Sequence, residues 1–172
     1  IATVYRKRYE SDLKKGINKA RWIEYSLSAS LMMVAISLLV GIYDLGSLIM
    51  IFSLTSVMNL LGLAMEITNQ GREKPYWVTY WIGCLAGIVP WVVVALYFYL
   101  SAQNGSSAPT FVYWIFVSIF VFFNLFAINM ILQYKKIGRW SDYLYGERAY
   151  VILSLVAKSA LAWQVFAGTL RP

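Results

Sequence analysis

The run Ser154-Leu155-Val156-Ala157-Lys158-Ser159-Ala160-Leu161-Ala162-Trp163-Gln164 sets one charged residue in the middle of a long apolar stretch. The nearest other charges along the chain are Arg148 and Arg171, so each end of a helix through this stretch lies roughly 15 to 20 Å from Lys158. A lysine side chain cannot reach the membrane surface over that distance. Because an unpaired ammonium at bilayer depth costs about 3 kcal/mol, we expect Lys158 to have a functional or covalent role, the alternative being a structural ion pair.

The whole chain has the composition of a membrane protein. Of its 172 residues, 60% are hydrophobic and 13% are charged, and the apolar residues form long blocks. We therefore predict an all-α transmembrane protein with residues 1–172 in a single helical domain. Five stretches can cross about 30 Å of hydrocarbon as helices: residues 22–41, 47–66, 76–100, 110–134 and 148–170.

The ends and the cysteine content add two expectations. Ile1 replaces an initiator methionine, and the first residues read as the continuation of a longer chain, so we expect an N-terminal truncation. Cys84 is the only cysteine and there is no histidine, which argues against a disulfide or a metal site.

The basic residues predict the orientation, because lysine and arginine near helix ends are retained on the cytoplasmic side. Thirteen of the fifteen basic residues are expected at one face of the membrane, and Arg171 alone at the other. These are Arg6, Lys7, Arg8, Lys14, Lys15, Lys19, Arg21, Arg72, Lys74, Lys135, Lys136, Arg139 and Arg148. The N-terminal side is therefore expected in the cytoplasm and the C-terminus outside the cell. Nucleic-acid binding is not expected, because the charges flank spans and form no single basic surface.

Two carboxylates fall inside or at the rim of the expected spans, Glu24 and Glu66. Glu24 shares a helical face with Ser28, Leu31 and Ala35, which we expect to point into the bundle. Burial disfavours an ammonium, so a lysine such as Lys158 can offer a neutral amine that attacks a carbonyl and forms a Schiff base. A protonated Schiff base needs an anionic counter-ion, and Glu24 is the candidate. The alternative for Glu24 is an interfacial residue hydrogen-bonded near Arg21.

Several segments resemble heliorhodopsins, a family of microbial rhodopsins. They are Arg21-Trp22-Ile23-Glu24-Tyr25-Ser26-Leu27-Ser28, Gly83-Cys84-Leu85-Ala86-Gly87-Ile88-Val89-Pro90-Trp91, Gly146-Glu147-Arg148-Ala149-Tyr150 and the lysine block from Leu153 to Gln164. The resemblance runs through essentially all of the chain. It implies a seven-helix retinal protein of which this chain holds the last five helices, and the same orientation as the basic residues predict.

The resemblance also implies residue roles. Lys158 would bind retinal, all-trans in the dark, as a Schiff base with Glu24 as counter-ion, and Ser154 would stand where ion-pumping rhodopsins keep a second carboxylate. Tyr25 and Phe123 resemble the aromatics that sandwich the polyene. Weaker pocket candidates are Ser28, Met32 and Met58. For each of these, ordinary helix packing is the alternative, since Phe123 continues a stripe of phenylalanines at helical spacing.

Gly83 and Gly87 form a small-x-x-x-small pair that lets backbones approach closely. The resemblance implies a homodimer whose interface uses this span and the one before it, and packing inside one protomer is the alternative. Pro90 is expected to kink the same helix.

The favoured function is a light sensor that signals to a cytoplasmic partner without being an enzyme. A light-driven ion transporter is the main alternative, although the five spans offer Glu24 and no second residue that looks like a proton donor. A membrane enzyme or transporter with a structural lysine is the third, and it predicts a colourless protein after retinal is added.

Overall fold

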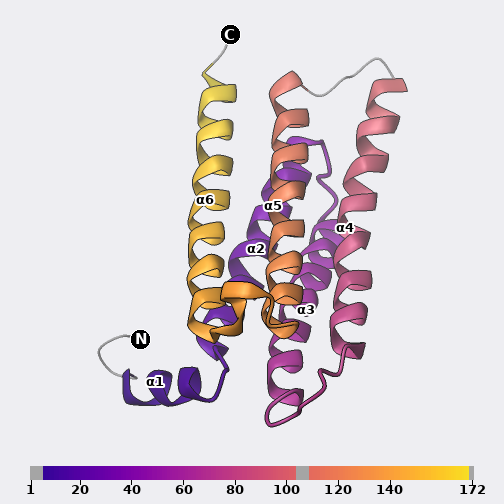
Figure 1. The fold of residues 1–172 in the computed structure, drawn as a ribbon. Helices are drawn as coiled ribbons and strands as arrows, with labels where there is room; N and C mark the ends of the chain where they lie inside the picture. Colours follow the sequence, from indigo (N-terminus) through magenta and orange to yellow (C-terminus); the bar gives the residue numbers. More distant parts are fainter. Residues whose placement is uncertain (1–5, 104–108, 171–172) are drawn as a thin grey trace. The chain divides into compact units, whose positions relative to one another are not determined.

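Five apolar helices make up most of the chain. The computed structural model describes residues 6–103 and 109–170, and no strand occurs within them. The five helices are long and apolar enough to cross a membrane, which confirms the predicted all-α transmembrane class. They are α2 (Lys19–Leu39), α3 (Leu45–Thr68), α4 (Val78–Gln103), α5 (Thr110–Tyr134) and α6 (Tyr143–Thr169), drawn in Figure 1. Arg171 and residues 104–108, between the third and fourth expected spans, lie outside the described residues.

The helices differ from the sequence prediction at two places. The last span was expected from residue 148, but α6 begins at Tyr143 because the Asp142 side chain caps it, accepting a hydrogen bond from the Leu144 N–H at 3.0 Å. The sequence analysis also missed α1 (Arg6–Lys14) and the short 3₁₀ helix η1 (Gly138–Ser141). Both are short and polar, so they lack the long apolar block by which the spans were recognised.

A tight turn separates α1 from α2. Gly16 has a φ of 73°, and the Gly16 N–H donates to the Leu13 carbonyl at 3.0 Å while the Ile17 N–H donates to the Asp12 carbonyl at 3.0 Å. This pair of bonds is the Schellman arrangement that ends helices at a left-handed glycine. The chain therefore turns sharply, and α1 lies across the direction of α2 (Figure 1).

The chain divides into two compact units, one made of Ile1–Ala35 and Tyr43–Val93, the other of Ile36–Ile42 and Val94–Pro172. In the first unit, glycines let helices approach. The Trp22 ring of α2 lies directly against Gly62 of α3, where a Cβ atom would overlap it. Gly83 and Gly87 of α4 meet Met58 of α3, so this glycine pair makes a close contact inside one protomer.

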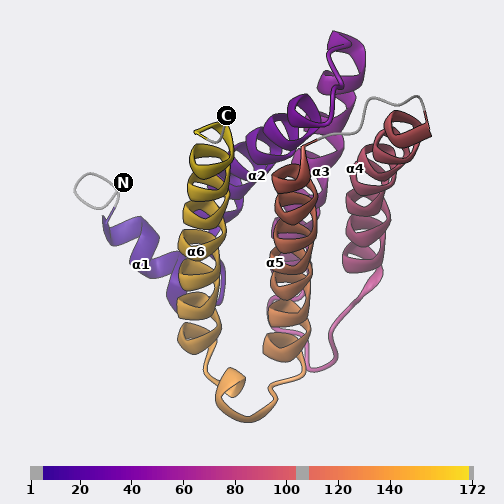
Figure 2. The ribbon, with the colours of Figure 1, turned by 90° about the horizontal axis from the view of Figure 1, so that it is seen from above.

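In the second unit, α5 and α6 run antiparallel and side by side (Figure 1 and Figure 2). The Ser118 hydroxyl lies 3.0 Å from Gln164 Oε1 and donates to it, and at the other end Asn129 Nδ2 donates to the Gly146 carbonyl at 3.2 Å. Trp140 of η1 joins this end, since its Nε1–H donates to Asn129 Oδ1 at 2.7 Å. These polar contacts fix the register of the two helices.

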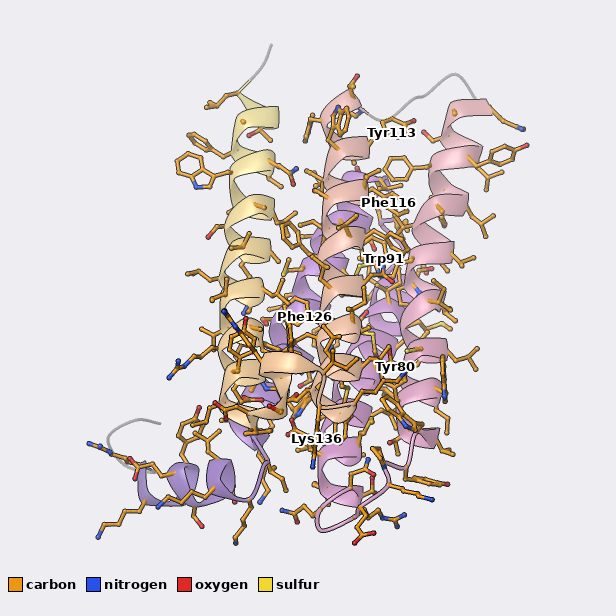
Figure 3. All side chains as sticks on the ribbon, in the orientation of Figure 1. Tyr80, Trp91, Tyr113, Phe116, Phe126 and Lys136 are labelled. Carbon is orange, nitrogen blue, oxygen red and sulfur yellow. The ribbon has the colours of Figure 1, made fainter. Side chains whose placement is uncertain are left out.

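Aromatic rings fill other parts of the second unit. Tyr113 of α5 stacks on Phe98 of α4 with ring centroids 4.6 Å apart, and Phe116 meets the Phe98 ring edge-on at 5.3 Å. Phe126 of α5 stacks on the buried Tyr150 of α6 at 6.1 Å. Figure 3 labels Tyr113, Phe116 and Phe126 along α5. The phenylalanine stripe noted in the sequence is thus used at least partly for helix packing, as its packing alternative predicts.

The glycine contacts predict opposite effects for the same substitution at two buried sites. A Cβ at Gly62 would overlap the rigid Trp22 ring, so Gly62→Ala should destabilise the protein by about 1–3 kcal/mol. A Cβ at Gly83 would meet its nearest atoms at 3.5 Å, an ordinary contact, so Gly83→Ala should be neutral or stabilising. Thermal unfolding in detergent, followed by circular dichroism, measures both. Equal losses of stability in the two variants would contradict the packing described.

Candidate functional site

Lys158 lies in the middle of α6, fifteen residues after Tyr143 and eleven before Thr169. It is therefore about 22 Å and about 16 Å from the two helix ends. Its side chain is half-buried, whereas the neighbouring Leu155 and Val156 are exposed. The buried Ala157 and Leu161 mark the inner face of α6, and Lys158 lies at the edge of that face.

The register of α5 and α6 sets Phe123 at about the depth of Lys158. Lys158 is six residues before Gln164, and Phe123 is five residues after Ser118, the hydrogen-bonding partner of Gln164. At 1.5 Å per residue these offsets are about 9 Å and about 7.5 Å in the same direction, because the helices are antiparallel. Ser154, one turn before Lys158, is half-buried like Phe123. The second unit thus brings these three candidates to neighbouring levels of one helix pair.

The candidates on α2 divide between two sides of the helix. Tyr25 is buried and lies on the same side of α2 as Trp22 and Ser26. Trp22 packs on α3, and the Ser26 hydroxyl donates to a carbonyl of α2 itself. Glu24 is exposed within the described structure, and so is Leu31, although the face they share was expected to point inward. The difference arises because α2 packs its Trp22 side on α3, which turns the Glu24 side away from this contact.

Ala35 belongs to the same face of α2 as Glu24 and is half-buried. Ser28 and Met32 are also half-buried, and the Ser28 Oγ atom is buried with no hydrogen-bond partner in the described part of the chain. A buried hydroxyl is normally satisfied, so this atom is open to a ligand. Met58 of α3, by contrast, packs its side chain on Gly87.

A buried ion pair, missed in the sequence analysis, ties the start of α2 to the end of α3. Arg21 Nη2 bonds Glu66 Oε1, and the two side chains are only 4% and 2% exposed. The Asn18 N–H donates to Glu66 Oε2 at 3.0 Å, and the Arg21 guanidinium lies 4.3 Å from the centre of the Trp22 ring. The spacing of Arg21 and Glu66, 45 positions apart, does not predict that they pair. The one indication in the sequence is that a basic residue and a carboxylate are expected at the same face of the membrane.

Two carboxylates within the spans, Glu66 and Glu147, are unsuited to balance the charge of Lys158. Glu66 already balances the charge of Arg21. Glu147, which the sequence analysis placed in a connector, is a buried residue of α6, but it is eleven residues from Lys158. That separation is about 16 Å along one helix, beyond the reach of a lysine side chain.

The family model for heliorhodopsin matches residues 1–170. The chain belongs to the heliorhodopsin family. No curated protein matches it. Heliorhodopsins bind retinal as a family property and are multi-pass membrane proteins of the photoreceptor type, so membership accounts for the five apolar helices.

The residues present fit a long apolar aldehyde. Within the second unit, Lys158 offers an amine among apolar neighbours and Phe123 lies near its depth. The described residues contain no group of three His, Cys, Asp or Glu that could hold a metal ion.

The buried ion pair predicts a non-additive response to mutation. Glu66→Gln leaves the Arg21 charge buried with its anion removed, so it should destabilise the protein by about 3–5 kcal/mol. The double variant Arg21→Gln, Glu66→Gln removes both charges and should recover part of that loss. Chemical unfolding in detergent measures the cycle, with the exposed Glu73→Gln as control. Additive effects would mean that the two side chains do not depend on each other.

Proposed function

We propose that this heliorhodopsin is a light sensor in which Lys158 carries retinal and Glu24 is the counter-ion. The observation that carries the proposal is the half-buried amine of Lys158 at the centre of an apolar helix, near the depth of an aromatic ring on the neighbouring helix. Intramembrane lysines are rare and costly, and they mark functional sites.

When bound, all-trans-retinal supplies a light-absorbing polyene and an aldehyde carbon. The Lys158 amine supplies the nitrogen of the Schiff base, and the surrounding apolar side chains keep water from hydrolysing that bond. Glu24 supplies the negative charge that holds a proton on this nitrogen, because Glu66 is engaged by Arg21 and Glu147 is too distant along α6. Ser154, one turn from Lys158, adds a neutral hydroxyl and no second charge.

The pocket residues follow from the same assignment. Tyr25 and Phe123 are the proposed aromatic walls, and Ser28 supplies a hydroxyl whose hydrogen bond is not used by other described residues. Met32 and Met58 are proposed as adaptable apolar contacts. Of the two, Met58 has the weaker support, since its side chain packs on Gly87.

Sensing, and not ion transport, fits the distribution of charge. Separating a charge pair in a site of low polarity is worth several kcal/mol even at an effective dielectric constant near 20, which is enough to bias a helix arrangement. Glu24 sits on the helix whose neighbouring turn holds the Arg21–Glu66 pair, so a change at Glu24 can be passed to α3 and to the cytoplasmic surface. We propose that a cytoplasmic partner reads this change.

The orientation and assembly belong to the same proposal. The N-terminal side is assigned to the cytoplasm and the C-terminus to the cell exterior, on the strength of the basic residues at the start of α2, the end of α3 and the start of α6. A homodimer is proposed from family membership alone. The Gly83–Gly87 pair adds no support for it, since both glycines contact Met58 of the same chain.

Removing the amine tests the attachment site. Lys158→Ala should give no visible absorption band when all-trans-retinal is added, because no other amine is held at that depth. Lys136→Ala, at an exposed lysine outside the spans, should keep the band of the parent protein. A retained band in Lys158→Ala would contradict the assignment.

Removing the counter-ion tests Glu24. In Glu24→Gln the Schiff-base proton loses its stabilising charge, so the visible band should vanish at a lower pH than in the parent pigment. A spectroscopic pH titration measures the midpoint, and a loss of one pH unit corresponds to about 1.4 kcal/mol of lost interaction. Glu73→Gln should leave the midpoint unchanged. A midpoint that does not move in Glu24→Gln would transfer the counter-ion role to another group.

Illumination of cells that carry the pigment distinguishes sensing from transport. The proposal predicts no sustained change of external pH, because one carboxylate beside the Schiff base provides no directional relay. A sustained shift that an uncoupler abolishes would favour the light-driven transporter.

A further inference from the structure

The first helix presents a set of exposed lysines that the proposed function does not use. In α1, Tyr9 and Leu13 are half-buried and lie about one turn apart on one side. Lys7 and Lys14 are exposed and, being seven residues apart, share another side, and Lys15 follows directly. Helix α1 is therefore amphipathic, with an apolar side of two residues and a cationic side.

Neighbouring cations of this segment are already paired. Arg6 Nε bonds Glu10 Oε1 at 2.7 Å, and Lys19 Nζ lies 3.4 Å from Asp12 Oδ2. The hydrogen bond from Arg6 lowers the pKa of Glu10, so this carboxylate stays ionised and cancels the charge of Arg6 near neutral pH. Lys7, Lys14 and Lys15 form none of the ion pairs found in the described part of the chain, although Lys14 also helps to lower the pKa of Glu10.

The position of α1 is set by contacts with the start of α2. The turn at Gly16 lays α1 across α2 (Figure 1), and Asn18 Nδ2 donates to the Tyr9 hydroxyl at 3.4 Å. Gln70 Nε2, just beyond the end of α3, donates to the Lys15 carbonyl at 3.5 Å. Because α2 and α3 cross the membrane, a helix laid across their ends runs along the membrane surface.

We propose that the cationic side of α1, formed by Lys7, Lys14 and Lys15, binds the headgroups of anionic phospholipids in the leaflet at which α2 begins. Clusters of basic residues beside a membrane span are attracted to anionic lipid, and the phosphate layer lies at the depth of this helix. Lipid is therefore the acidic partner that the geometry holds within reach. A nucleic acid or an acidic protein would have to approach the same lysines from solution.

The test compares lipids at the surface of the full chain in bilayers. The association of spin-labelled phosphatidylglycerol relative to spin-labelled phosphatidylcholine is measured by electron paramagnetic resonance at low and high salt. The parent protein should prefer phosphatidylglycerol several-fold, each lysine contributing up to about fivefold, and salt should weaken the preference. The variant Lys7→Gln, Lys14→Gln, Lys15→Gln should lose most of it.

The matched control is Arg6→Gln with Glu10→Gln, which removes a pair on the same helix without changing net charge and should keep the preference. An unchanged preference in the triple lysine variant, or an equal loss in the control, would overturn the proposal. So would binding of an oligonucleotide through the three lysines by a protein that shows no lipid preference. The measurement needs no retinal, so its failure leaves the light-sensor proposal standing, and the reverse also holds.

Discussion

Hydrocarbon tolerates a charge only when another group balances it or when chemistry uses it, and this constraint governs the charged side chains deep within the helices. Arg21 and Glu66 satisfy it with each other, almost fully shielded from solvent. Lys158 lies about 16 Å along α6 from Glu147, the buried carboxylate of the same helix. The proposed attachment of retinal to Lys158, with Glu24 as counter-ion, gives these two charges a role as well.

Helix α2 connects the structural and the functional parts of this scheme. Its first turns hold the ion pair with α3 and the contact between Trp22 and Gly62, while Glu24 lies one turn after Arg21 and on the side away from Trp22. A rearrangement of charge at Glu24 therefore acts on a helix whose contacts with α3 lie two and three residues away, at Trp22 and Arg21. In the proposed sensor, this arrangement gives a light-induced change a physical route to the membrane surface.

The sequence was sufficient for the class and for the helices that long apolar blocks define. Their hydropathy predicts the five spans, and the resemblance to heliorhodopsins read from the sequence is confirmed by the family model over residues 1–170. The sequence did not predict α1 or the early start of α6. A short polar helix lacks a periodic pattern of apolar residues, and so does a helix start that depends on a capping residue such as Asp142. The Arg21–Glu66 pair was also missed, since pairing across 45 positions depends on how α2 and α3 pack. The exposure of Glu24 has the same origin, because the bulk of Trp22 and the absence of a side chain at Gly62 decide which side of α2 faces α3.

The most direct measurement of the central claim is the chemical location of the bound chromophore. The full chain is incubated with all-trans-retinal in the dark, the lysine linkage is reduced with borohydride, and the peptides are analysed by mass spectrometry. The predicted result is one retinyl group on the α6 peptide that contains Lys158, at a stoichiometry near one per chain. Modification spread over exposed lysines such as Lys135 and Lys136, with Lys158 unmodified, would contradict it.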